Sequence, residues 1–184
     1  MKEDKIVILD RDGVINVDLM TYVTSPEEFE VIDGSLEAIG RLTANGYKVA
    51  IATNQACIEK EIITKAELKK VHDHMVELVS KVGGEINYIA YCPHLPESHC
   101  KCRKPELGLL HEIEEGLATS LKGRYFVGDK ESDMLAGRNF GCIPLLIKKG
   151  GYGEKVFGTE NSPPEDRCFD SLNGAVNYIL KKEV

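Results

Sequence analysis

The sequence has no long run of Lys or Arg, and its acidic residues outnumber the basic ones by 30 to 23, which gives a formal charge of -7. Proteins that bind nucleic acid or an anionic membrane as their main task present concentrated positive charge. The lack of such a concentration argues against both kinds of partner. We therefore expect a small soluble partner, with no nucleic acid and no membrane.

Long apolar stretches are missing as well. The apolar run at 6–9 follows charged residues and is too short for a signal-peptide core or a membrane span. This predicts a cytoplasmic protein. No segment resembles an interdomain linker or an internal repeat, and 184 residues are enough for one substantial core. The sequence therefore predicts one domain over residues 1–184.

Short β-rich runs alternate along the chain with amphipathic stretches that are typical of helices. The predicted strands lie at 5–9, 47–53, 86–91, 124–128 and 143–147. The predicted helices lie around 36–44, at 64–82, at 106–117, from 131 onward and at 172–182, and the second of them begins with a capping box at Thr64 and Glu67. The region 148–169 is expected to be a long surface loop. This alternation predicts a parallel α/β sheet.

Polar residues follow the ends of four predicted strands. They are Asp10, Arg11 and Asp12; Thr53, Asn54 and Gln55; Arg103 and Lys104; and Asp129, Lys130 and Asp133. Because ligands of open α/β sheets bind beyond the carboxyl ends of the strands, we expect these residues to share one site. Converging carboxylates repel one another unless a cation lies among them, and hard oxygen ligands favour Mg²⁺.

Such a site suits phosphoryl transfer, which needs positioning and charge stabilisation. Lys104 and the Thr53 hydroxyl are predicted to neutralise and orient a phosphate that also contacts Mg²⁺. Asp10 is the predicted nucleophile, which would form an aspartyl-phosphate. Asp12 is predicted to protonate the leaving alcohol and then to activate water.

Four motifs occur together in one order along the chain: DRDGV at 10–14, TN at 53–54, Lys104 before the fourth strand, and GDKESD at 128–133. Together they resemble the haloacid dehalogenase superfamily of aspartate-nucleophile phosphatases. The resemblance implies an α/β, Rossmann-like three-layer sandwich with a mainly parallel central sheet. Because no insertion of domain size follows the first or third strand, we expect no large cap domain.

The same resemblance implies roles for the strand-end residues. Asp10 would be nucleophile and Mg²⁺ ligand, Asp12 would be the general acid/base whose backbone carbonyl also reaches the metal, and Asp129 would be the other protein ligand. Thr53 and Lys104 would hold the phosphoryl group. Asp133 would support the residues around the metal without binding the metal itself.

Cysteines cluster in the loop YCPHLPESHCKCRKPELG. Cys92, His94, Cys100 and Cys102 form a complete set of three thiolates and one imidazole for a closed, structural Zn²⁺ site. His99 is the rival imidazole, but its position beside Cys100 is awkward for a shared ion. A bound zinc ion would fix a loop without regular structure and so hold the nearby Lys104 in place.

The zinc loop at 92–102, the capless pattern and the segment TNQ at 53–55 also resemble the family of heptose 1,7-bisphosphate phosphatases, with histidinol phosphatases nearest to it. The resemblance implies removal of the C7 phosphate on the way to nucleotide-activated heptose. Separately, we expect the protein to be a monomer. The residues implied to line the substrate are Asp18, Thr53, Asn54, Gln55, Arg103 and Lys130. Two alternatives remain open: a phosphatase for histidinol phosphate or another small monoester, and a non-catalytic phosphate- or zinc-binding module.

One segment departs from that family. After TNQ the family continues with Ser-Gly-Ile and soon an arginine, whereas this chain has ACIEKE at 56–61. This loop helps to choose the substrate and its anomer, so the departure bears on the sugar and leaves the chemistry intact. Lys60 is a candidate replacement for the arginine, although a point charge lacks the guanidinium fork.

Several nearby residues have plainer expectations. His72 and His74 lie two positions apart on a predicted helix, so they point in different directions, and we expect both to be solvated. Arg11 is expected to point to the side opposite the two acids that flank it. Cys57 is expected to be a free cysteine near the site.

Overall fold

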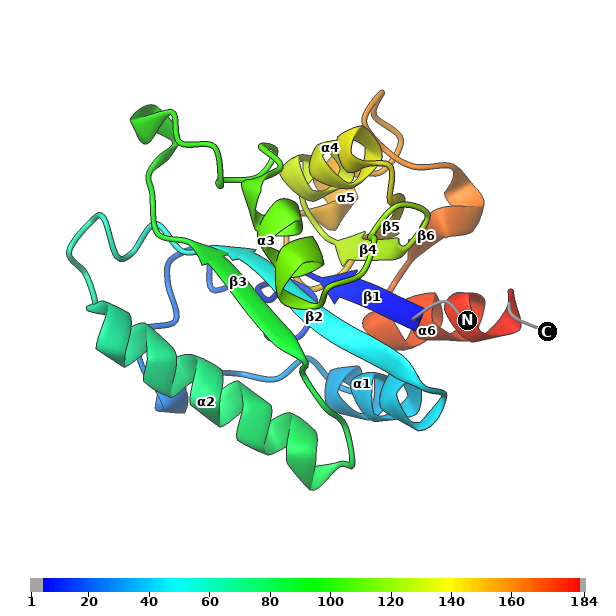
Figure 1. Ribbon diagram of the computed structural model, residues 1–184, viewed down its shortest axis with the longest axis horizontal. Helices are drawn as coiled ribbons and strands as arrows, with labels where there is room; N and C mark the ends of the chain where they lie inside the picture. The colour runs from blue at the N-terminus through cyan, green and yellow to red at the C-terminus, as the bar shows by residue number, and fades with distance from the viewer. Residues whose placement is uncertain (1–4, 183–184) are drawn as a thin grey trace.

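The computed structural model describes residues 5–182 and contains one six-stranded sheet in which every paired strand is parallel. The sheet order is β3-β2-β1-β4-β5-β6, so β1 lies between β2 and β4 (Figure 1). The strands are β1 (Lys5–Leu9), β2 (Tyr47–Asn54), β3 (Tyr88–Cys92), β4 (Tyr125–Gly128), β5 (Ile143–Ile147) and β6 (Cys168–Phe169).

Helices cover both faces of the sheet. They are α1 (Ser35–Ala44), α2 (Lys65–Lys81), α3 (Gly108–Gly116), α4 (Glu131–Phe140), α5 (Gly153–Val156) and α6 (Leu172–Lys181). Successive residues of a strand point to opposite faces, so Val7 and Leu9 pack with α1, α2 and α6, while Ile6 and Ile8 pack with α3 and α4. This is the predicted three-layer sandwich.

The predicted elements are confirmed, with boundaries that differ by one or two residues. Apolar runs buried on both faces form β1, β2, β4 and β5, and the capping box of Thr64 and Glu67 starts α2. The region 148–169 is more ordered than the expected surface loop, because it contains the short α5 and the edge strand β6. Between residues 5 and 182, no further domain interrupts the sheet, and no helix has the length and apolar character that a membrane crossing requires.

Candidate active site

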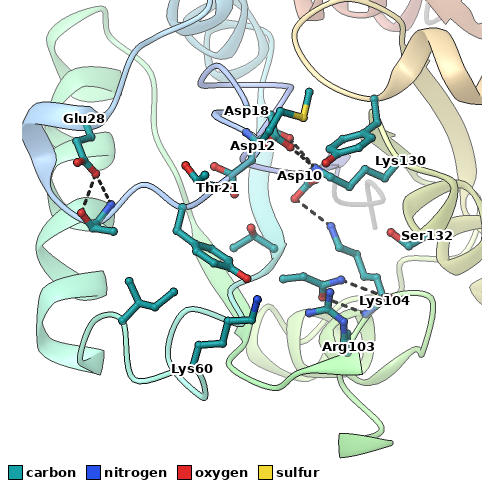
Figure 2. Close-up of a pocket in the computed structure, with 17 residues that line it drawn as sticks. Asp10, Asp12, Asp18, Thr21, Glu28, Lys60, Arg103, Lys104, Lys130 and Ser132 are labelled. Carbon is teal, nitrogen blue, oxygen red and sulfur yellow. Dashed lines mark hydrogen bonds and ion pairs between the residues drawn. The ribbon is translucent and has the colours of Figure 1, made fainter. Parts of the chain in front are cut away.

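The carboxyl ends of β1, β2 and β4 meet at one edge of the sheet and open into a cavity of about 830 Å³ (Figure 2). Because these three strands are neighbours, residues that are far apart in the sequence lie side by side at this edge. All the predicted catalytic and substrate residues except Gln55 line the cavity, namely Asp10, Asp12, Asp18, Thr53, Asn54, Arg103, Lys104 and Lys130.

Asp10 lies at the floor of this cavity and is 3% exposed. Its Oδ1 lies 3.0 Å from Nζ of Lys104 and accepts a 2.8 Å hydrogen bond from the backbone N–H of Arg11. Its backbone N–H donates to the carbonyl of Val127 on β4, which continues the sheet pairing by one residue. The carboxylate is therefore held by the backbone of the next residue and by a buried cation, and it lines the cavity.

Lys130 is surrounded by oxygens that the sequence assigns to Mg²⁺. Its Nζ lies 3.2 Å from Oδ1 of Asp129, 3.4 Å from the backbone oxygen of Asp12 and 3.7 Å from Oδ2 of Asp10. It also forms a 2.9 Å ion pair with Asp18. Carboxylate and carbonyl oxygens converging on one positive charge are the donor set that a hard divalent cation prefers, so these residues fit Mg²⁺.

The electrostatics of Asp129 support the same conclusion. Burial raises the pKa of Asp129 to about 7, and the nearby Asp10 and Asp133 add to the shift while Lys130 opposes it. A divalent cation would favour the charged form of such a carboxylate. Gly13 packs against this group with φ +83, and a Cβ there would lie 2.2 Å from Oδ2 of Asp129. Glycine is thus required at position 13 both by backbone conformation and by space.

Lys104 is almost completely buried between two carboxylates. Its Nζ lies 2.6 Å from Asp133 and 3.0 Å from Asp10, and it donates to the carbonyl of Ala52 at 2.6 Å. Burial lowers the pKa of Lys104, but the charges of Asp10 and Asp133 outweigh this effect, so the net shift is upward. Asn54 accepts from the Lys104 backbone N–H and donates to its carbonyl, which fixes the loop to the end of β2.

Asp12 is held by three side chains. Arg11 approaches its carboxylate through Nε and NH2 at 2.9–3.2 Å, Asn16 donates to Oδ1 at 2.9 Å and Gln55 donates to Oδ2 at 2.9 Å. Burial raises the pKa of Asp12, but the Arg11 charge and the hydrogen bonds from Asn16 and Arg11 outweigh it and hold the pKa below its ordinary value. The carboxylate keeps one side toward the cavity, where its side chain is 20% exposed.

The outer part of the cavity carries two further cations, Lys60 and Arg103. Lys60 Nζ lies 5.3 Å from the centre of the Tyr22 ring, and Arg103 donates to the carbonyl of His94 at 3.0 Å. Figure 2 shows both cations across the cavity from Asp12 and Asp18. An anionic group at this end of a substrate would therefore meet the positive charges of Lys60 and Arg103.

The four predicted zinc ligands converge in the loop that precedes Lys104. Sγ of Cys92, Cys100 and Cys102 and Nδ1 of His94 lie within 4.8 Å of one another, with closest separations of 3.2–3.6 Å. Ligands about 2.3 Å from a tetrahedral zinc ion stand roughly 3.5–3.8 Å apart, so the cluster fits Zn²⁺. His99 is not part of this cluster.

The chain matches the family model of polynucleotide kinase 3 phosphatase over residues 5–157. The D-glycero-beta-D-manno-heptose-1,7-bisphosphate 7-phosphatase of Pseudomonas putida is 43% identical over 177 residues, which cover 96% of this chain and 99% of the relative. The chain belongs to this heptose bisphosphatase family. The predicted resemblance to haloacid dehalogenase-type phosphatases is thereby confirmed.

Two further heptose bisphosphatases are informative. The crystal structure of the D,D-heptose 1,7-bisphosphate phosphatase from B. bronchiseptica, complexed with magnesium and phosphate, superposes with a TM-score of 0.91 at 36% identity and covers 97% of this chain and 99% of its own. A Campylobacter jejuni relative, 34% identical over 98% of both chains, is named for the alpha anomer, whereas the Pseudomonas putida enzyme is named for the beta anomer. The family therefore contains enzymes named for the alpha anomer and enzymes named for the beta anomer.

The loop 56–61, where this chain departs from the family pattern, is hydrogen-bonded to the zinc loop. Glu59 accepts hydrogen bonds from the backbone N–H of Leu95 and from the Ser98 hydroxyl, and its own N–H donates to the carbonyl of Pro93. The position of Lys60 at the cavity rim is thus set by its neighbour's contacts with the zinc loop.

Three expectations about individual residues differ from the structure. Gln55 is 1% exposed and donates to Asp12 and Thr53, so it lies behind the cavity wall instead of lining the substrate space. Arg11 is fully buried and turns back to Asp12, since that carboxylate is the nearest partner for its charge. His72 is 6% exposed and contacts Arg11, so the expected solvation is wrong for this histidine.

Among the residues of the site that the sequence did not predict, Asn16 and Tyr152 contact the predicted acids. Asn16 donates a hydrogen bond to Asp12. It lies four residues after Asp12 in the turn that follows β1, and this short spacing is a sequence signal that could have predicted the contact. Tyr152 donates its backbone N–H to Asp129 at 2.8 Å and lines the cavity. Because the donor is a backbone N–H, no side-chain pattern in the sequence predicts this contact. The sequence therefore predicts only a surface loop at 148–169.

Proposed function

We propose that this protein is a Mg²⁺-dependent phosphatase that removes the C7 phosphate of D-glycero-D-manno-heptose 1,7-bisphosphate through an aspartyl-phosphate on Asp10. The observation that carries the proposal is the placement of Asp10 between the buried Lys104 and the oxygens of Asp12 and Asp129, at the floor of a cavity whose rim is cationic. The family to which the chain belongs supports the sugar.

The residues divide the reaction into two steps. The Asp12 carboxylate, ionised in the free site, takes up a proton from solvent when the substrate phosphate lies beside it. A carboxylate oxygen of Asp10 then bonds to phosphorus while the bond from phosphorus to the sugar oxygen breaks, and Asp12 gives that proton to the sugar oxygen. Asp12 then takes a proton from water, the water oxygen bonds to phosphorus, and the bond to Asp10 breaks to release phosphate. Lys104 and Thr53 hold the phosphoryl oxygens, and Mg²⁺ bound by Asp10, Asp129 and the Asp12 carbonyl would neutralise developing charge.

The sugar and its second phosphate would occupy the outer cavity. Arg103 offers a fork of donors suited to a phosphate, and Lys60 adds a point charge from the opposite loop. Asp18, Asn54 and Lys130 also line the cavity. Sugar hydroxyls and phosphate oxygens would meet the Asp18–Lys130 ion pair, whereas the Asn54 amide is already bonded to the Lys104 backbone and holds that loop in place. This distribution favours a substrate with anionic groups at both ends over a simple monoester.

We expect phosphate release to be fastest with heptose 1,7-bisphosphate and to require Mg²⁺, because the carboxylates that face the phosphate need a cation. The measurement is kcat/KM for the alpha and beta anomers, for fructose 1,6-bisphosphate and for histidinol phosphate, each with and without Mg²⁺. Preference for histidinol phosphate would contradict the heptose assignment. A protein that releases phosphate from none of these esters would contradict the assignment of a phosphatase.

We also propose that Cys92, His94, Cys100 and Cys102 bind one structural Zn²⁺. Metal analysis is expected to find about one zinc per chain, as for a single closed site. Cys102→Ser should lose this metal and also much of the activity, because the zinc loop leads directly into Arg103 and Lys104. Cys168→Ser, which changes a cysteine outside the cluster, is the matched control. A zinc-free protein with full activity would rule out the site.

A further inference from the structure

His72 is a buried histidine to which the chemistry above gives no task. It lies on α2, is 6% exposed, and packs edge-on against the ring of Tyr91 with the ring centres 5.9 Å apart. Its Nε2 lies 3.2 Å from NH1 of Arg11. Through His72, helix α2 therefore contacts Arg11, the arginine that lies between the two catalytic acids in the sequence.

The Arg11 guanidinium distributes its donors between two partners. Nε and NH2 point to the Asp12 carboxylate, and NH1 points to His72. The arginine side chain is only 1% exposed, so a donor that lost its acceptor could not turn to bulk water instead. The guanidinium is planar and rigid, so fixing NH1 also fixes the direction from which Nε and NH2 approach Asp12.

The residue type at position 72 matters for this arrangement. A hydrocarbon side chain would leave NH1 without an acceptor, and a carboxylate would compete with Asp12 for the guanidinium. A neutral imidazole accepts one hydrogen bond and carries no charge to draw Arg11 away. Burial and the adjacent Arg11 charge lower the pKa of His72 to about 3, which keeps the ring neutral with Nε2 free to accept.

We propose that His72 is a positioning residue for the general acid: by accepting from Arg11, it fixes the orientation in which Asp12 meets the leaving oxygen of the substrate. This inference rests on the proposed function, in which Asp12 protonates the departing alkoxide. Small displacements matter at this point, since a shift of about 1 Å in a reacting group can lower a rate by 10²-fold. Asn16 and Gln55 also hold Asp12, but both are neutral, and Arg11 supplies the charged contact.

The test compares two leaving groups. An alkoxide must receive a proton as its bond to phosphorus breaks, whereas p-nitrophenolate leaves as a stable anion. Because kcat/KM covers only the steps up to the release of the leaving group, the ratio of kcat/KM for an alkyl phosphate to that for p-nitrophenyl phosphate reports on proton donation. The amount of folded enzyme cancels from this ratio, so a partly unstable variant remains informative.

His72→Phe keeps the ring and the contact with Tyr91 but removes the acceptor. We expect it to lower kcat/KM for heptose 1,7-bisphosphate by about 10- to 100-fold, and that for p-nitrophenyl phosphate by less than about threefold. His72→Gln restores an acceptor and should bring the ratio back to within about threefold of the original protein. His74→Phe, which alters a histidine on the same helix away from Arg11, is the matched control.

Each result is decisive. An equal fall for both substrates in His72→Phe would show a general structural role, and no fall for either would show no role, so both would overturn the proposal. Asp12→Ala separates this outcome from a failure of the proposed function. If Asp12→Ala selectively loses the alkyl substrate and His72→Phe does not, the positioning role is wrong and the phosphatase mechanism stands. If Asp12→Ala shows no selectivity, the acid role of Asp12 is wrong and the proposal for His72 falls with it.

Discussion

Asp10→Asn is expected to lower turnover of heptose 1,7-bisphosphate by at least about 10⁴-fold, the scale seen when a covalent nucleophile is removed. An amide cannot form the acyl-phosphate, and it is a poorer ligand for a divalent cation. The fold should persist, because Lys104 keeps its 2.6 Å pair with Asp133 and the sheet pairing at this point uses only backbone atoms. The measurement is phosphate release in the presence of Mg²⁺, together with thermal unfolding.

Asp73→Asn is the matched control for this prediction. It makes the same change of charge at an exposed carboxylate on α2 that pairs with its helical neighbour Lys69. Turnover should be unchanged in that variant. Substantial activity in Asp10→Asn would refute the assignment of the nucleophile, whichever sugar is used.

Lys104→Met should produce the second large effect, on stability as well as on rate. It removes the cation between two buried carboxylates, and breaking a buried ion pair by removing one partner lowers the free energy of unfolding by about 3–5 kcal/mol. Turnover should fall by about 10²-fold or more, because a charge that neutralises the phosphoryl group is lost. Denaturant unfolding without added Mg²⁺ and phosphate release with Mg²⁺ measure the two effects.

Lys69→Met provides the comparison for the loss of stability. Lys69 forms an ion pair of the same 2.6 Å length with Asp73, but its side chain is 73% exposed. Removing an exposed pair should change the free energy of unfolding by no more than about 0.5 kcal/mol. Similar losses in the two variants would show that burial does not govern the contribution of Lys104.

The sequence was most informative where the physical signal is local. The apolar runs that become β1, β2, β4 and β5 are buried on both faces, so their pattern predicts strands without knowledge of their neighbours. The residues after those strands share one edge because parallel strands end together. For this reason the sequence alone predicts that Asp10, Thr53 and Asp129 lie at one edge of the sheet, and that Lys104, on the segment after β3, joins them there.

The remaining features depend on contacts between distant segments. The pattern of α2 alone predicts a solvated His72, because only the folded chain brings Nε2 of His72 within 3.2 Å of NH1 of Arg11, in the turn after β1. Gln55 follows Thr53 and Asn54 at the end of β2, so its position predicts a substrate contact. In the structure its side chain is buried and donates to Asp12 instead. The strand β6 consists of two residues, too few for any periodicity, and exists through pairing with β5.

The place of β1 in the middle of the sheet has a consequence for how the chain folds as it is synthesised. β2 follows soon and covers one edge of β1, but the other edge pairs with β4, in register from Val7 with Tyr125 to Leu9 with Val127. That edge stays open until the ribosome has made the intervening segment. An open, apolar strand edge invites pairing with another nascent chain, and such non-local pairing forms slowly. The strand that leads into Asp10 therefore keeps an apolar edge open to other nascent chains until β4 has been made.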